Sequence, residues 1–219
     1  MRRNAISCSS WRLYAIIDRA AAGNRDLAEV AAAAIRGGAD VIQLRDKTAS
    51  ARQLREEAAR ILPLARAAGI PLIINDRADV ATSAGADGVH LGQDDLPIAA
   101  AREVVGPHRL IGQSTHSLEQ ALAAEREGAD YIGVGPIFPT PTKPDYGSVG
   151  PALIETVSSR VHLPIVCIGG IDATTLEPVL AAGATCVAVV RAVCGATDPE
   201  QAARAFKERL AHCVRAAPY

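Results

Sequence analysis

Residues 128 to 143 read Gly-Ala-Asp-Tyr-Ile-Gly-Val-Gly-Pro-Ile-Phe-Pro-Thr-Pro-Thr-Lys, and they contain one unit of a repeat that runs through the chain. In this unit a Gly-Ala-Asp triplet follows a predicted helix and precedes a short apolar strand at 131–134. The triplet recurs, with Thr in place of Asp in the last copy, at residues 38–40, 85–87 and 183–185. Each copy precedes a predicted strand, and such repeats indicate a fold built from similar units.

Between these units the chain alternates strands with helices. Apolar runs predict eight strands, at residues 13–18, 41–44, 72–75, 89–91, 110–113, 131–134, 165–168 and 186–190. The alternation implies a parallel sheet, and near-continuous apolar strands imply a sheet that is covered on both faces. We predict an α/β fold, a single (β/α)8 TIM barrel with a parallel eight-stranded sheet; a doubly wound open sheet is the alternative. Residues 1–12 are expected to form a flexible N-terminus and 13–219 a single barrel domain.

Several helix boundaries can be predicted from local signals. Ser50 with Gln53 matches a capping box at the start of one helix. Ser117 with Gln120 matches another, and Thr174 with Glu177 is expected to cap a third. Pro63 should kink or break the helix that begins after Ser50, because proline lacks an N–H and clashes with the preceding turn.

Composition excludes several classes of function. The chain has 219 residues, 49% of them apolar, and a net charge of −1, so we expect one well-buried domain. No basic run suggests nucleic acid as a partner, and no apolar run has membrane-spanning length. The first apolar run is too short for a signal-peptide core, which predicts a cytoplasmic location. Oligomeric state is open, with a homodimer as one possibility.

One candidate anion site follows the last two predicted strands. Gly169-Gly170 and the Val190-Arg191 pair stand where barrels often bind a monophosphate through backbone N–H groups. The alternative is a helix-initiating turn without a ligand. The loop after 131–134 adds two hydroxyls and a cation, Thr140, Thr142 and Lys143, which suit a phosphate; its alternative is a rigid surface turn.

A second candidate site combines cations with carboxylates at successive strand ends. Arg45 and Lys47 follow the second predicted strand, Asp76 the third and Asp95 the fourth. Carboxylates do not bind phosphates directly, but they hold Mg²⁺, which takes one or two of them together with phosphate oxygens. The alternative is a set of surface salt bridges. No proton-transfer role is assigned to the strand-end histidines.

Taken together, these motifs resemble the thiamine-phosphate synthase (thiamine-phosphate pyrophosphorylase) family over about residues 13–210. The matching segments are Gln43-Leu44-Arg45-Asp46-Lys47, Asn75-Asp76, His90-Leu91-Gly92-Gln93-Asp94-Asp95, Ser114-Thr115-His116-Ser117, residues 135–143 and Ile168-Gly169-Gly170-Ile171. Any one of these segments is a weak signal, but all of them in this order are highly specific.

The resemblance implies a transferase that condenses an aminopyrimidine methyl diphosphate with a thiazole phosphate. It also implies roles for single residues. The pyrimidine diphosphate would contact Gln43, Leu44, Arg45, Asp46, Lys47 and Asn75, with Ser114 and His90 near the pyrimidine. The thiazole phosphate would contact Thr140, Pro141, Thr142, Gly170, Val190 and Arg191. Asp76 and Asp95 would hold Mg²⁺, and Ser114, Lys143, Arg45 and Lys47 would be catalytic. One departure is Arg191, where many relatives have Ser.

The implied chemistry is dissociative: diphosphate leaves first, and the thiazole nitrogen then attacks the methylene cation. Mg²⁺ and the cations would neutralise charge on the leaving group. Two alternatives are kept. A related enzyme, a thiazole tautomerase-like paralogue, would use His116 and need no diphosphate site. A protein of another class, a non-catalytic one, would only bind thiamine phosphate.

Overall fold

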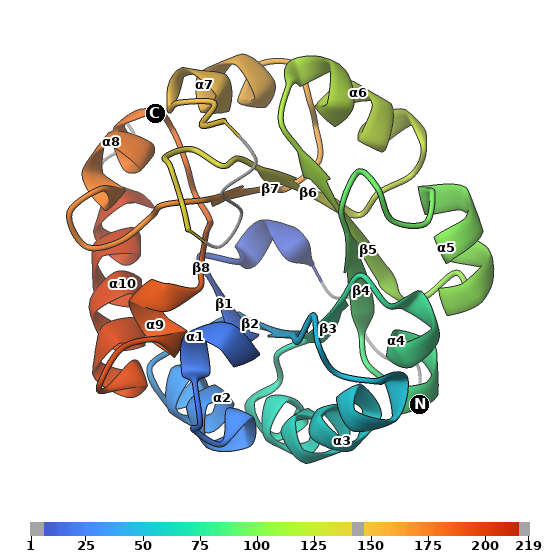
Figure 1. The fold of residues 1–219 in the computed structure, drawn as a ribbon. Helices are drawn as coiled ribbons and strands as arrows, with labels where there is room; N and C mark the ends of the chain where they lie inside the picture. Colours follow the sequence, from blue (N-terminus) through green and yellow to red (C-terminus); the bar gives the residue numbers. More distant parts are fainter. Residues whose placement is uncertain (1–6, 142–146, 215–219) are drawn as a thin grey trace.

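Eight parallel strands form a closed barrel in the computed structural model, which describes residues 7–141 and 147–214 (Figure 1). The strands are β1 (Leu13–Asp18), β2 (Val41–Arg45), β3 (Leu72–Asn75), β4 (Gly88–Leu91), β5 (Leu110–Thr115), β6 (Tyr131–Val134), β7 (Ile165–Ile168) and β8 (Val187–Val189). Each strand pairs with the next in sequence, and β8 pairs with β1. The predicted (β/α)8 barrel is therefore confirmed, and the β1–β8 pairing excludes the open sheet.

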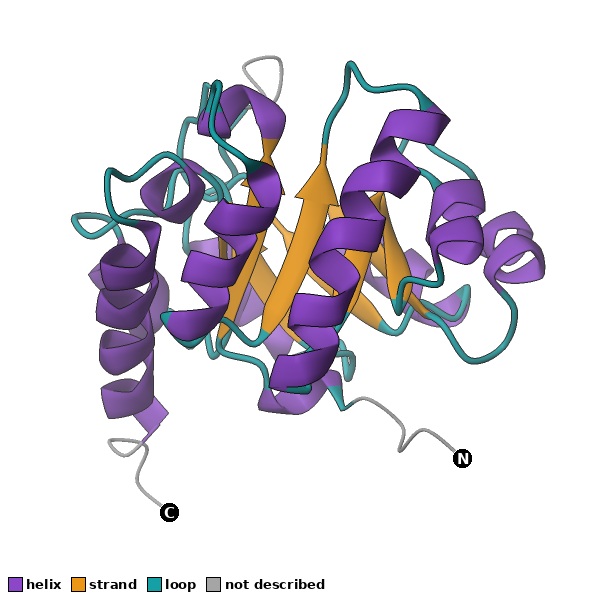
Figure 2. Cartoon of the chain, turned by 90° about the horizontal axis from the view of Figure 1, so that it is seen from below, coloured by secondary structure: helices purple, strands orange, loops and turns teal. Residues whose placement is uncertain are grey.

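The helices form a ring outside the strands, as the two perpendicular views show (Figures 1 and 2). They are α1 (Arg19–Ala22), α2 (Leu27–Arg36), α3 (Ala51–Ala68), α4 (Ala78–Ala84), α5 (Ile98–Val105), α6 (Leu118–Arg126), α7 (Ala152–Ser158), α8 (Leu176–Ala181), α9 (Arg191–Cys194) and α10 (Pro199–Val214). Within the described residues, no helix is both long and apolar enough to cross a membrane.

The Gly-Ala-Asp repeat has a structural cause. In its first three copies, an aspartate oxygen accepts a hydrogen bond from a backbone N–H near the start of the preceding odd-numbered strand. The pairs are Asp40 with Leu13, Asp87 with Leu72 and Asp130 with Ile111, at 2.9, 3.0 and 2.7 Å. The repeat therefore ties the N-terminal ends of neighbouring strands together, at the end of the barrel opposite the functional loops.

Two of the predicted helix starts agree with the structure, one of them only in part. Ser50 and Gln53 form a complete capping box at α3, with the Ser50 N–H donating to Gln53 Oε1 at 2.8 Å. At α6, Ser117 Oγ accepts from the Gln120 N–H at 3.2 Å, but the Gln120 side chain accepts from the His116 N–H instead. The second box is therefore only half formed.

One other predicted helix start is wrong, and the predicted break at Pro63 does not occur. α8 begins at Leu176, and Thr174 instead donates its N–H to the Asp172 carboxylate in the preceding turn. Pro63 does not break α3, which continues to Ala68. Pro63 lies on the exposed face of α3, where water can satisfy the carbonyl that the missing N–H leaves without a partner.

The described part of the expected flexible N-terminus packs onto the barrel instead. Cys8–Ser10 forms a turn of 3₁₀ helix, seen in dark blue across the far end of the barrel in Figure 1. Trp11 is only 3% exposed, and its ring lies 5.2 Å from that of Tyr131 in an edge-to-face arrangement. Such aromatic contacts bury large apolar areas. The segment thus fills the barrel interior at its N-terminal end, while the C-terminal end stays open.

Candidate active site

A pocket of about 280 Å³ opens at the C-terminal ends of the strands, and every strand contributes to its lining. Many of the predicted site residues line it, namely Gln43, Arg45, Asn75, His90, Ser114, Thr140, Pro141, Gly170, Val190 and Arg191. Thr142 and Lys143 lie outside the described residues. The volume and the mixture of apolar walls with a few polar groups suit a small organic ligand.

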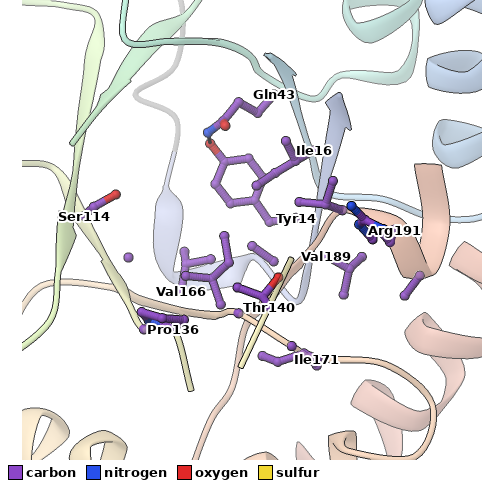
Figure 3. Close-up of a pocket in the computed structure, with 18 of the residues that line it drawn as sticks. Tyr14, Ile16, Gln43, Ser114, Pro136, Thr140, Val166, Ile171, Val189 and Arg191 are labelled. Atoms are coloured by element: carbon purple, nitrogen blue, oxygen red, sulfur yellow. Dashed lines mark hydrogen bonds between the residues drawn. The ribbon is translucent and has the colours of Figure 1, made fainter. Parts of the chain in front are cut away.

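The two sides of the pocket differ in character. Gln43, Tyr14 and Ser114 place polar atoms on one side (Figure 3). Pro136 and Val166 form part of an apolar wall, and Arg191 lies across the view from Ser114. The pocket can therefore hold a flat apolar ring and make polar contacts at its edges.

A chain of hydrogen bonds crosses the pocket floor. Gln43 Nε2 donates to the Tyr14 hydroxyl at 2.8 Å, and this hydroxyl lies 2.9 Å from that of Tyr131. The Tyr131 hydroxyl is 3.1 Å from His90 Nδ1, and His90 Nε2 is 3.0 Å from Ser114 Oγ. Burial raises the pKa of both tyrosines, so both carry their hydroxyl protons at neutral pH.

Arg45 is held at the pocket edge by a carboxylate that the sequence argument did not use. Its Nη1 pairs with Asp18 Oδ2, and the two side chains are 13% and 4% exposed. Asp18 also caps α1, because its Oδ1 accepts from the Ala21 N–H at 2.9 Å. The guanidinium is therefore fixed in position before any ligand binds.

Lys47, Asp76 and Asp95 form a charged group next to the pocket. Lys47 Nζ lies 2.6 Å from Asp76 Oδ2. Asp76 has a φ of 62°, rare for a residue other than glycine, and its N–H donates to the His90 carbonyl at 2.8 Å. Burial, together with the nearby Asp76 carboxylate, raises the pKa of Asp95. Two carboxylates in mutual contact favour a cation between them.

This charged group fits Mg²⁺ better than a metal that needs a complete protein cage. Within 7–141 and 147–214, no three His, Cys, Asp or Glu side chains are arranged to hold a metal. Mg²⁺ commonly takes one or two carboxylates and completes its shell with water and phosphate oxygens. Asp76 and Asp95 supply that number of ligands.

Two of the predicted binding residues point their side chains elsewhere. Leu44 is fully buried in the apolar layer between the barrel and its helices. The Asp46 carboxylate accepts hydrogen bonds from the Thr48 and Ala49 N–H groups, at 2.9 and 3.1 Å. The Leu44 side chain lies on the outer face of β2, and the Asp46 carboxylate stabilises its own loop. At these two positions the backbone is therefore what remains to contact a ligand, and their binding role stays a prediction.

The glycine pair after β7 has a packing role. Gly169 and Gly170 have φ values of 98° and 65°, a region that favours glycine. A Cβ atom on Gly170 would lie 2.7 Å from Phe138 Cβ and 2.8 Å from the Pro139 carbonyl oxygen. The glycines therefore let the loop after β6 lie close against the end of β7, which brings Thr140 to the pocket.

Comparison with known proteins decides the family. The thiamine monophosphate synthase family profile matches residues 13–193. The chain belongs to this family. A thiamine-phosphate synthase of Roseiflexus castenholzii is 50% identical over 195 residues, which cover 89% of this chain and 86% of the relative. One from Chloroflexus aurantiacus is 50% identical over 198 residues, 90% and 91% of the two chains.

Solved structures agree with this assignment. Thiamine phosphate pyrophosphorylase from Pyrococcus furiosus superposes with a TM-score of 0.87 at 36% identity, covering 94% of this chain and 98% of that one. A 3-hexulose-6-phosphate synthase, at 21% identity and a TM-score of 0.64, covering 90% of this chain and 98% of that one, shares the fold alone. The family expected from the motifs is thus confirmed, and with it the class of enzyme, a transferase.

Three residues of the site were not predicted from the sequence. Tyr14 and Tyr131 stand in apolar strands, where they suggest core aromatics, and Asp18 suggests a structural carboxylate. A signal was present for the tyrosines, since alternate residues of barrel strands face inward. What the sequence did not reveal is that the two hydroxyls meet, because Tyr14 and Tyr131 are 117 residues apart.

Proposed function

We propose that this chain is a thiamine-phosphate synthase that joins a 4-amino-2-methylpyrimidine methyl diphosphate to a thiazole phosphate. Family membership supports the activity. The observation that carries the substrate assignment is the position of the charged group. Lys47 pairs with Asp76 and stands two residues after Arg45, and Asp76 directly follows Asn75; Arg45 and Asn75 both line the pocket, which is otherwise largely apolar. This arrangement suits a flat ring with a diphosphate at one end.

The proposed binding mode follows the two sides of the pocket. Gln43, Asn75 and Ser114 would contact the edge of the pyrimidine, and Arg45 with Lys47 would contact the diphosphate. The thiazole phosphate would lie on the opposite side, against Gly170, Val190 and Arg191. A carbon–oxygen bond of one substrate and the ring nitrogen of the other would then face each other across the pocket.

In the proposed reaction the bond between the methylene carbon and the diphosphate oxygen breaks first. The electron-rich aminopyrimidine stabilises the cation that forms, and the thiazole nitrogen supplies the electron pair for the new carbon–nitrogen bond. Arg45 and Lys47 counter the charge that develops on the departing diphosphate. Mg²⁺, held by Asp76 and Asp95, would supply further charge neutralisation. Lys143 would add a contact to the diphosphate, on the strength of the family resemblance.

The test is an omission assay for diphosphate release. Protein, both phosphorylated substrates and Mg²⁺ are mixed, and each component is left out in turn. We expect release only in the complete mixture. Asp76→Asn should reduce it strongly, whereas Asp79→Asn should not, since Asp79 is an exposed carboxylate paired with Arg77. Equal loss in both variants would refute the metal assignment.

A second candidate rests on His116, which lines the pocket with its Nδ1 bonded to the Gly135 carbonyl oxygen. A tautomerase-like paralogue would use this ring to move a proton on the thiazole. Such a protein would convert a thiazole isomer without the pyrimidine substrate and release no diphosphate. A non-catalytic binding protein would do neither, so the same assay separates all three.

Location and assembly are part of the proposal as well. We infer a cytoplasmic enzyme, and we retain the homodimer as a prediction. Light scattering of the purified chain, measured with and without both substrates, tests the second point.

A further inference from the structure

The hydrogen-bond chain in the pocket floor has a direction. Its first member, Gln43, donates through Nε2 to the Tyr14 oxygen. A phenol has a single proton, and Tyr14 is 1% exposed. Gln43 Nε2 is itself a donor, so among the described residues the Tyr131 hydroxyl, 2.9 Å away, is the partner that can accept the Tyr14 proton. The Tyr131 oxygen is thereby an acceptor as well.

The same reasoning fixes the far end of the chain. Tyr131 is fully buried, and its proton is directed to His90 Nδ1 at 3.1 Å. A neutral imidazole that accepts at Nδ1 carries its proton on Nε2. That proton is donated to Ser114 Oγ at 3.0 Å. Ser114 accepts from the histidine, so its own hydroxyl proton is left for an acceptor in the pocket, into which its oxygen points (Figure 3).

Two glycines make room for the contact between Tyr131 and His90. A Cβ atom on Gly112 of β5 would lie 2.5 Å from His90 Nδ1 and closer still to the Tyr131 ring. On β6, a Cβ atom on Gly133 would lie 3.3 Å from His90 Cε1. Glycine inside a strand weakens the strand and often marks a close approach. Here the space that these two glycines leave is occupied by the Tyr131–His90 contact.

We propose that Gln43, Tyr14, Tyr131 and His90 act as a directional series of positioning residues that makes Ser114 a hydrogen-bond donor to the substrate. The site then selects, at that point, a ring with an acceptor nitrogen and rejects one that presents an N–H or amino group. This rests on the proposed function, in which a pyrimidine ring occupies this side of the pocket. A site built for one hydrogen-bond polarity discriminates strongly, because the wrong ligand leaves buried polar groups without partners.

The first test needs no substrate and therefore does not depend on the activity. Protein labelled with ¹⁵N at its five histidines reports the tautomer of each ring, and His90→Gln identifies the His90 signals by their loss. We expect the Nε2–H tautomer for His90 at neutral pH. An Nδ1–H tautomer or a doubly protonated ring would overturn the proposal, even if the protein makes thiamine phosphate.

The second test is a double-mutant cycle on turnover. Tyr131→Phe removes one hydroxyl and keeps the ring, and it should lower kcat about tenfold, the effect of one hydrogen bond. The KM for the thiazole phosphate should not change. In a Ser114→Ala background the same substitution should have no further effect, since the series then has nothing to orient. Losses that multiply in the double variant would show a merely structural role for Tyr131.

A milder variant keeps the test decisive if Tyr131→Phe does not fold. Tyr14→Phe removes the link to Gln43 but leaves the Tyr131–His90 contact in place. We expect a loss of roughly threefold in kcat, again absent in the Ser114→Ala background. Thermal melts of each variant provide the folding control. A Tyr14→Phe loss that persists unchanged without the Ser114 hydroxyl would contradict the series.

Discussion

Asp18 lies at the end of β1 and is 3% exposed, and its two carboxylate oxygens have different partners. Oδ2 pairs with the Arg45 guanidinium, and Oδ1 accepts from the Ala21 N–H at 2.9 Å. Asp18→Asn is nearly isosteric. Its amide oxygen can keep the contact with Ala21, but its NH₂ group faces another donor. The variant therefore leaves the buried charge of Arg45 without a counter-charge.

The expected magnitude follows from this burial. Removing one partner of a buried ion pair costs about 3–5 kcal/mol. For a chain of this length each kcal/mol lowers Tm by roughly 2–4 °C, so Asp18→Asn should lower it by roughly 6–20 °C. The matched control is Asp79→Asn, which breaks an ion pair of 2.6 Å whose side chains are 43% and 59% exposed. Its Tm should change by no more than about 4 °C.

Calorimetric melts measure both variants, and kinetics adds a second readout. Asp18→Asn should also raise the KM for the pyrimidine diphosphate, since Arg45 is no longer fixed at the rim. Replacing both partners, Asp18→Leu with Arg45→Met, should restore much of the stability but not the turnover. If Asp18→Asn melts within the range of the Asp79→Asn control, the buried pair does not have the role assigned to it.

Four further variants test the ligand sites. Asp76→Ala should lower turnover more than about 100-fold yet leave metal-free binding of thiamine phosphate nearly intact. Gly170→Val should weaken the binding of thiamine phosphate even in EDTA, because the valine side chain displaces the loop at Phe138. Equal losses of metal-free binding affinity for both variants, measured by calorimetry, would contradict the arrangement of two separate sites. If the backbone at Arg191 contacts the phosphate, Arg191→Ser should change the KM for thiazole phosphate by less than about tenfold, or roughly 1.4 kcal/mol. A larger change in steady-state kinetics would show that the guanidinium itself binds the phosphate. The raised pKa of Asp95 means that the folded state favours its protonated form, so its contribution to stability is present below the ordinary pKa of 3.8 and is lost as pH rises. Melts in EDTA should then show Asp95→Asn more stable than the unchanged chain at pH 7 but not at pH 3, and no difference at pH 7 would count against a strained carboxylate pair.

The fold could be predicted because its signals are local. Each Gly-Ala-Asp triplet ends a helix and begins a strand within a few residues, and the order of strands in a barrel follows the order in sequence. The capping box of Ser50 and Gln53 could be predicted for the same reason, because both residues belong to one helical turn. Pro63 misled the prediction because its effect depends on which face of α3 meets water, and that is decided by tertiary packing.

The site was only partly predictable, since its contacts are made between distant strands. Motif matching located Arg45, but it did not indicate that Asp18 pairs with it. It also took Asp46 as a ligand residue along with its neighbours, although the Asp46 carboxylate is engaged by its own loop. Sequence spacing does not distinguish a side chain that faces the pocket from one that supports the loop beside it.

The fourth copy of the repeat differs from the others in a way that affects motion. Thr185 replaces the aspartate there and is exposed, and the strand that follows, β8, has only three residues. The quarter of the barrel made by β7 and β8 is therefore without the carboxylate that ties strand starts together elsewhere. Partial opening of a folded protein begins where such restraints are fewest. We therefore expect amide hydrogens of β7 and β8 to exchange with solvent before those of β3 and β5. The wall that carries Gly170 and Arg191 would then be the part of the barrel that opens most often.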